Sequence, residues 1–138
     1  MLAQTLTTSF KLQLPQAVHN LLTNTIKLAL YTGAANLDAT TTVYSTDNEI
    51  TGTGYTAGGN ILTGATISAD SNGVVYINFD NSTWNPAAFT TRAGLIYNAS
   101  QSNKSVAVLD FGADKTCTTS FTVQMPANNA SSALLRFS

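Results

Sequence analysis

The sequence predicts an all-β protein, an antiparallel β-sandwich of about eight strands that is jelly-roll-like and carries one N-terminal helix. Short runs of alternating apolar and polar residues recur along the chain, separated by Gly, Asn and Pro. Asp70-Ser71-Asn72-Gly73 lies between two such runs, and Asn-Gly there favours a hairpin turn. The longest β-rich stretch, residues 90–111, is divided by the turn-forming residues 98–103. The chain has 138 residues without a repeat or linker, so we expect a single domain, 1–138.

The N-terminal segment, about residues 1–22, is predicted to be a helical arm. Within residues 9–22, apolar side chains recur at helical spacing: Phe10, Leu14, Ala17, Val18 and Leu21. Thr8 or Ser9 can cap the start of this helix. Pro15 either kinks one helix or begins a second short one as its first residue.

The first strands follow this arm. Residues 26–31 alternate as a strand with one buried face, and residues 32–42 read as a loop. Val43-Tyr44 is either a short strand or part of that loop. Residues 60–69 and 74–79 form the predicted hairpin, and Trp84 and Phe89 are expected to close one end of the core.

The last strands are centred on residues 93–97 and 105–111. Val106-Ala107-Val108-Leu109 is apolar on both faces, which predicts a strand covered on both sides. Residues 112–115 are predicted to turn the chain into a strand over 118–125, and residues 133–137 form a closing strand.

The composition is poor in charge. Only 9% of residues are charged, against roughly 25% in typical domains, and the net charge is −1. We therefore expect neither a nucleic-acid partner nor an anionic membrane surface. The neutral polar side chains lose little solvation when a neighbouring subunit covers them, which favours an assembly subunit over a Thr-rich monomer. The N-terminus lacks the features of a secretory signal, so we expect a soluble protein made in the cytoplasm.

Residues that carry chemistry are few. His19 is the only histidine, which excludes a self-contained Ser-His-Asp triad or multi-histidine metal site. We expect His19 at the edge of the core and the lone cysteine, Cys117, to be an inert strand residue. The sequence predicts no enzyme, cofactor or metal.

Three acidic residues allow other interpretations. Asp110 lies on the face of Val106 and Val108, where we expect an ion pair with Arg92 or Lys104, or an exposed strand end, in preference to an active site. Asp47 and Glu49 could contribute to a calcium site, but no EF-hand spacing follows them.

Residues 52–59, Gly-Thr-Gly-Tyr-Thr-Ala-Gly-Gly, form the most flexible stretch by composition. The spacing lacks the third glycine of a dinucleotide fingerprint, and no Gly-Lys-Ser/Thr occurs in the chain. We interpret the stretch as a surface loop that contacts a neighbouring subunit.

Three segments resemble a family of small structural proteins of tailed bacteriophages. They are Val18-His19-Asn20 with residues 25–32, the glycine stretch 52–59, and residues 92–98 with 104–112. The resemblance implies a virion protein, most specifically a capsid decoration (cement) protein on the outer surface of the head. It implies a homotrimer that clamps subunits of the major capsid protein.

For that role we expect subunit contacts through two sets of residues, listed here: Leu2, Leu6 and Phe10 in the N-terminal arm, and Gly52, Gly54, Tyr55, Gly58 and Gly59 in the glycine stretch. Packing of Phe10 on its own core is the alternative for that residue. A second hypothesis is a tail, baseplate or fibre module that binds host glycans through Tyr55, Trp84 or Tyr97. A carbohydrate-active enzyme is a third, and the scarcity of paired acids counts against it.

Overall fold

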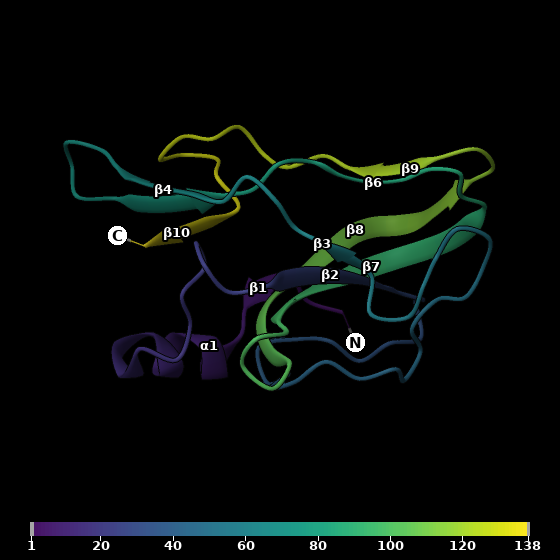
Figure 1. Ribbon diagram of the computed structural model, residues 1–138, viewed down its shortest axis with the longest axis horizontal. Helices are drawn as coiled ribbons and strands as arrows, with labels where there is room; N and C mark the ends of the chain where they lie inside the picture. Colours follow the sequence, from purple (N-terminus) through teal and green to yellow (C-terminus); the bar gives the residue numbers. More distant parts are fainter. Residues whose placement is uncertain (1, 138) are drawn as a thin grey trace.

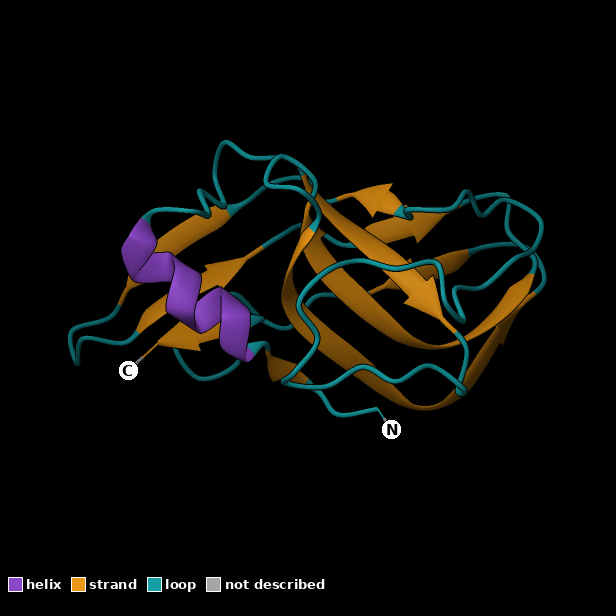
Figure 2. Cartoon of the chain, turned by 90° about the horizontal axis from the view of Figure 1, so that it is seen from below, coloured by secondary structure: helices purple, strands orange, loops and turns teal. Residues whose placement is uncertain are grey.

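Residues 2–137 fold into three antiparallel sheets and one short α-helix (Figures 1 and 2). The computed structural model describes residues 2–137. Its strands are β1 (Thr5–Leu6), β2 (Ile26–Tyr31), β3 (Asn60–Ile61), β4 (Thr66–Ala69), β5 (Val75–Asn78), β6 (Ser82–Trp84), β7 (Phe89–Asn98), β8 (Lys104–Cys117), β9 (Phe121–Val123) and β10 (Leu135–Phe137). The sheets have the orders β1-β8-β7-β2-β3, β10-β5-β4 and β6-β9. The predicted β-rich antiparallel class is confirmed, since 42% of the residues are in strands. The strand pairings do not show the predicted jelly-roll connection.

The β7–β8 hairpin is the centre of the largest sheet. Both predicted strands are confirmed, and both extend beyond the predicted ends. The predicted turn over residues 112–115 is wrong, because β8 continues to Cys117. Gly112 has a φ of +82°, and the register moves from Thr91 opposite Lys115 to Ala93 opposite Asp110. The extra residues of β8 are accommodated as a bulge within the ladder, so the strand bends without reversing.

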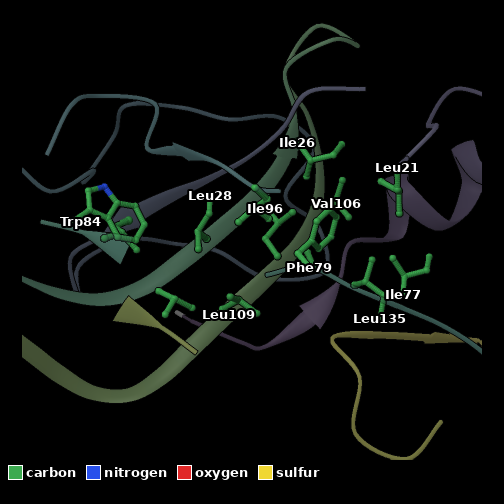
Figure 3. Close-up of a cluster of buried hydrophobic side chains, with 14 of the residues drawn as sticks. Leu21, Ile26, Leu28, Ile77, Phe79, Trp84, Ile96, Val106, Leu109 and Leu135 are labelled. Carbon is green, nitrogen blue, oxygen red and sulfur yellow. The ribbon is translucent and has the colours of Figure 1, made fainter. Parts of the chain in front are cut away.

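Both faces of this sheet are buried. One face joins the main core cluster, where Leu28, Ile96 and Val106 are packed with side chains from the other two sheets (Figure 3). The opposite face holds a second cluster that includes Tyr31 and Leu95. The prediction of one buried face for residues 26–31 is therefore wrong, since the sequence pattern did not reveal that a loop covers the second face. The prediction that residues 106–109 are buried on both faces is confirmed.

The N-terminal helix is shorter than predicted. α1 spans Thr8–Gln13, and a 3-10 turn, η1, spans Leu14–Gln16. Thr7, instead of Thr8 or Ser9, caps α1: its Oγ1 accepts from the Phe10 N–H at 3.3 Å. Pro15 was expected either to kink one helix or to begin a second short one. The second alternative holds, because Pro15 has no N–H to continue the α-helical ladder, although the new turn begins one residue earlier, at Leu14.

The hairpin predicted around Asn72-Gly73 is confirmed as β4 and β5. The run 60–69 is not one strand, because β3 pairs with β2 and β4 pairs with β5. The closing strand is confirmed as β10, which pairs with β5, while the strand predicted over 118–125 shortens to β9. Trp84 and Phe89 are both buried, as predicted, with ring centroids 6.4 Å apart. Val43-Tyr44 was expected to be either a short strand or part of a loop, and it is part of the loop. One isolated antiparallel bridge joins Val43 to Lys104.

Replacing a leucine by alanine should reduce stability more in the main core than on the exposed surface. We expect Leu28→Ala to lower the free energy of unfolding by about 2–5 kcal/mol, because the side chain is fully buried and leaves a cavity. Leu12→Ala is the matched control, since that leucine is 64% exposed on α1. Urea unfolding followed by tryptophan fluorescence measures both, and an equal loss in the two variants would contradict this description of the core.

Candidate functional site

The glycine stretch forms a loop at the end of the molecule where β7 begins (Figure 1). We call residues 52–59 the contact loop. Its residues 52–54, 56 and 57 are exposed, and none of the loop residues carries a charge. An isolated antiparallel bridge joins Thr53 to Ala88, just before β7. The loop therefore presents a neutral outer rim while part of its backbone is fixed to the sheet.

Two of the glycines are required by close approach of the loop to other backbone. Gly54 has a φ of +83°, and a Cβ there would collide with the carbonyl oxygen of Pro86. Gly59 has a φ of +76°, and a Cβ there would collide with the carbonyl oxygen of Leu28. Glycine alone satisfies both conditions. The composition that suggested a flexible loop instead allows the loop to pack tightly on its own chain.

Glu49 anchors the contact loop from within. Its Oε2 accepts from the Tyr55 hydroxyl at 2.6 Å and from the Gly58 N–H at 2.8 Å. Its Oε1 accepts from the Tyr44 hydroxyl at 2.7 Å. Hydrogen bonds to an ionised carboxylate are stronger than neutral ones, so one side chain holds the loop at two points.

Tyrosines complete the anchor. The Tyr97 hydroxyl donates to the Gly58 carbonyl at 2.7 Å, and its ring stacks on Tyr44 with centroids 4.6 Å apart. The Tyr55 hydroxyl accepts from the Leu30 N–H at 2.9 Å, which joins the loop to β2. We call Glu49, Tyr44, Tyr55 and Tyr97 the Glu49 cluster.

Burial and the nearby Glu49 carboxylate keep these hydroxyls protonated. Burial, followed by Glu49, raises the pKa of Tyr97 to about 12. Burial, followed by the hydrogen bond to Glu49, also raises the pKa of Tyr44 and of Tyr55. All three hydroxyls therefore remain donors across the neutral range, and the loop keeps its anchors.

The two predicted sets of contact residues lie apart. Leu2 and Leu6 are half-buried near the β1 edge of the large sheet, and Phe10 is fully buried in the core of its own chain. The contact loop runs directly into β3, at the opposite edge of that sheet. Within the loop, Gly52 and Gly54 are exposed, Tyr55 and Gly59 are half-buried, and Gly58 is buried. The structure thus does not combine the arm and the loop into one surface.

Other predicted sites are occupied by internal contacts. Both carboxylate oxygens of Glu49 bind groups of the chain, which leaves Asp47 without its proposed calcium partner. Trp84 and Tyr97 are buried, so among the three aromatic residues suggested for glycan stacking only Tyr55 is partly exposed. Among the described residues no group of three or more His, Cys, Asp or Glu side chains could hold a metal ion.

The remaining predictions concern single residues. Asp110 pairs with Arg92, Oδ1 to Nε at 3.3 Å, and the Gly112 N–H, followed by Arg92, lowers the pKa of Asp110. Cys117 ends β8 as a half-buried residue, which confirms its predicted place in a strand, and His19 lies at the core edge with 9% exposure, as predicted.

A polar hollow lies beside the Glu49 cluster. It has a volume of about 460 Å³, and its lining includes Tyr31, Thr41, Ser45, Asp47 and Asn48. Hydroxyl and amide groups dominate this lining, with Asp47 as its one carboxylate. This chemistry offers hydrogen bonds but no arrangement of nucleophile and base.

The role of Glu49 as an anchor was missed at the level of sequence. Glu49 is the sole glutamate of the chain and precedes the contact loop by three residues, which was the available signal. Sequence spacing could not show that Tyr97 lies next to Glu49, because Tyr97 comes from the distant strand β7. Nor could it show that the loop turns the Tyr44 hydroxyl toward the Glu49 carboxylate.

No protein family, curated protein or solved structure matches this chain. No helix within residues 2–137 is long and apolar enough to cross a membrane.

Gly59→Ala tests the tight packing of the contact loop. We expect a loss of about 3 kcal/mol or more in the free energy of unfolding, because the methyl group meets the backbone of β2. Gly73→Ala is the control: Gly73 has a φ of +83° but nothing within 4 Å of its Cβ position, so only the backbone strain of about 1–2 kcal/mol applies. Thermal and urea unfolding compare the two variants. Equal losses would show that backbone strain alone requires these glycines.

Glu49→Gln tests the anchor. We expect the free energy of unfolding to fall by about 1–3 kcal/mol, because glutamine offers one uncharged acceptor oxygen to the three donors that the Glu49 carboxylate binds, the Tyr44 and Tyr55 hydroxyls and the Gly58 N–H. Hydrogen exchange of residues 52–59 should accelerate most. Asp47→Asn removes the same charge from an exposed neighbour and should leave both measurements unchanged. Unaltered exchange in Glu49→Gln would refute the anchor.

Proposed function

We propose that this protein is a structural subunit of a tailed-bacteriophage virion, specifically a capsid decoration protein that binds the outside of the head and stabilises contacts between major capsid protein subunits. The observation that carries the proposal is the contact loop: an exposed, uncharged rim that the Glu49 cluster fixes in one conformation. The resemblance of three segments to small virion proteins gives the class of partner.

A fixed neutral loop suits permanent assembly. A loop that is already ordered loses little conformational entropy when a partner covers it. An uncharged rim loses less solvation than Lys or Glu side chains would, so a neighbouring subunit can cover it at small cost. Because charge is absent, long-range steering is weak, which matters little when the partner is a fixed particle surface.

The oligomeric part of the proposal is a homotrimer. Several identical loops on one assembly bind a repeating capsid surface more tightly than one loop does, because the second and third contacts form at high local concentration. We also propose that the sheets pack as a jelly-roll-like sandwich, which makes the scaffold rigid enough to hold these loops at fixed spacing. The role requires binding and no turnover, so the protein acts without a cofactor.

The experiment combines assembly state with binding to particles. Native mass spectrometry of the purified protein should give three copies, and a cryo-EM map of the parent virion should show density on the outer head surface. Density at the tail tip or baseplate would contradict the capsid proposal and support the tail alternative.

Charged substitutions locate the binding surface. We expect Ala57→Arg, in the exposed rim, to weaken binding to heads that lack the protein by tenfold or more, since a buried unpaired charge costs more than about 1.4 kcal/mol. Ser71→Arg places the same side chain at the exposed β4–β5 turn, at the other end of the molecule, and should bind normally (Figure 1). Co-sedimentation with heads measures binding, and unchanged melting temperatures verify folding. Normal binding by Ala57→Arg would remove the contact loop from the interface.

A further inference from the structure

A buried polar network joins the N-terminal segment to the end of β7. His19 Nε2 lies 2.8 Å from Gln13 Oε1, and His19 Nδ1 lies 3.1 Å from Asn98 Nδ2. Asn98 Nδ2 also donates to Asn24 Oδ1 at 2.9 Å. His19 is 9% exposed and Asn98 is 0% exposed, so the centre of the network is buried, while Gln13 and Asn24 are half-buried. The network connects α1 and residues 17–24 to the last residue of β7.

The network determines the tautomer of His19. An amide nitrogen donates and does not accept, so His19 Nδ1 must be the acceptor of the Asn98 N–H. The ring proton is therefore on Nε2, where it donates to Gln13 Oε1. The ring is neutral in this arrangement.

Protonation of Nδ1 would place two donors against each other. Asn98 cannot relieve this by rotating its amide, because its Oδ1 accepts from the Ser100 N–H at 3.0 Å. A rotated amide would set Oδ1 against Asn24 Oδ1 and Nδ2 against the Ser100 N–H, which replaces one mismatch with two. The bond from Nε2 to Gln13 survives protonation, since Nε2 remains a donor. The mismatch thus falls only on the connection to β7.

We propose that His19 is an acid-sensitive latch, which holds residues 8–24 on the end of β7 while its imidazole is neutral and releases them when the imidazole is protonated. Release would expose Phe10 and Leu21, the two buried apolar side chains that this segment contributes to the core. The latch lies outside the contact loop, and it does not depend on the proposed function.

The surroundings of His19 also favour the neutral imidazole. Phe10 on α1 packs against the ring with centroids 5.0 Å apart, and Asn98 faces it from β7; neither side chain titrates. Lys104, the first residue of β8, is the charged group that acts on it. Burial, followed by Lys104, lowers the pKa of His19. Because the released segment has the ordinary histidine pKa of about 6.5, the latch is intact above that pH and weakens as the pH falls below it.

Hydrogen exchange at pH 7.5 and pH 5.0 tests the latch, since pH 5.0 is still above ordinary carboxyl pKa values of about 4. After correction for intrinsic exchange, we expect the protection of residues 8–24 to fall by up to about 30-fold at pH 5.0. These amides should exchange before those of β7 and β8 at both pH values. Exchange of the segment and the sheet in a single step, or equal protection of the segment at both pH values, would overturn the proposal.

Two further measurements test the latch, one on a substituted protein and one on the unaltered protein. His19→Gln keeps a neutral acceptor and should remove the pH dependence of residues 8–24; a persistent dependence would overturn the latch. In the unaltered protein, nitrogen NMR of the imidazole should show the Nε2–H tautomer at pH 7.5 and a titration midpoint below 6.5. An Nδ1–H tautomer, or a midpoint above 6.5, would also overturn it.

Discussion

The fold depends on the need to cover both faces of the β2–β7–β8 ladder. The three strands pair over most of their length, and buried side chains leave this ladder in both directions. On one face, the two smaller sheets and the N-terminal segment supply the main core cluster (Figure 3). On the other face, the segment 33–48 supplies the cover in place of a sheet. A loop in this position must satisfy its own polar groups, which explains the dense hydrogen bonding there.

The Glu49 cluster is one consequence of this cover. Tyr97 projects from the loop-covered face, and Tyr44 stacks on it from the covering segment. Glu49 follows that segment and brings the only glutamate of the chain between Tyr44 and the contact loop. The same side chains that close the second core therefore also fix the proposed binding surface.

His19 performs a comparable task at Asn98, the residue of β7 that follows Tyr97. Asn98, the last residue of that strand, is fully buried and binds His19 and Asn24 through one amide group. The N-terminal segment contributes a short helix, a 3-10 turn and irregular backbone. Besides this network, its attachment depends on a few buried side chains and on two polar contacts near the start of α1, from the Thr8 N–H to the Ala39 carbonyl and between the Ser9 and Ser105 hydroxyls. A neutral histidine makes this attachment conditional on pH, in contrast to the contact loop, whose tyrosines remain protonated.

The sequence by itself determined the β-rich antiparallel class, the β4–β5 and β7–β8 hairpins, the closing strand and the burial of Trp84 and Phe89. These features follow from local alternation and turn residues, which act over a few positions. Only the tertiary structure decided that β2 is buried on both faces, that β8 continues through Gly112 and that Phe10 lies in the core. It also decided that Glu49, with tyrosines from a loop and a distant strand, anchors residues 52–59. Such contacts join residues far apart in the chain, and periodicity carries no information about which distant segment covers a given face.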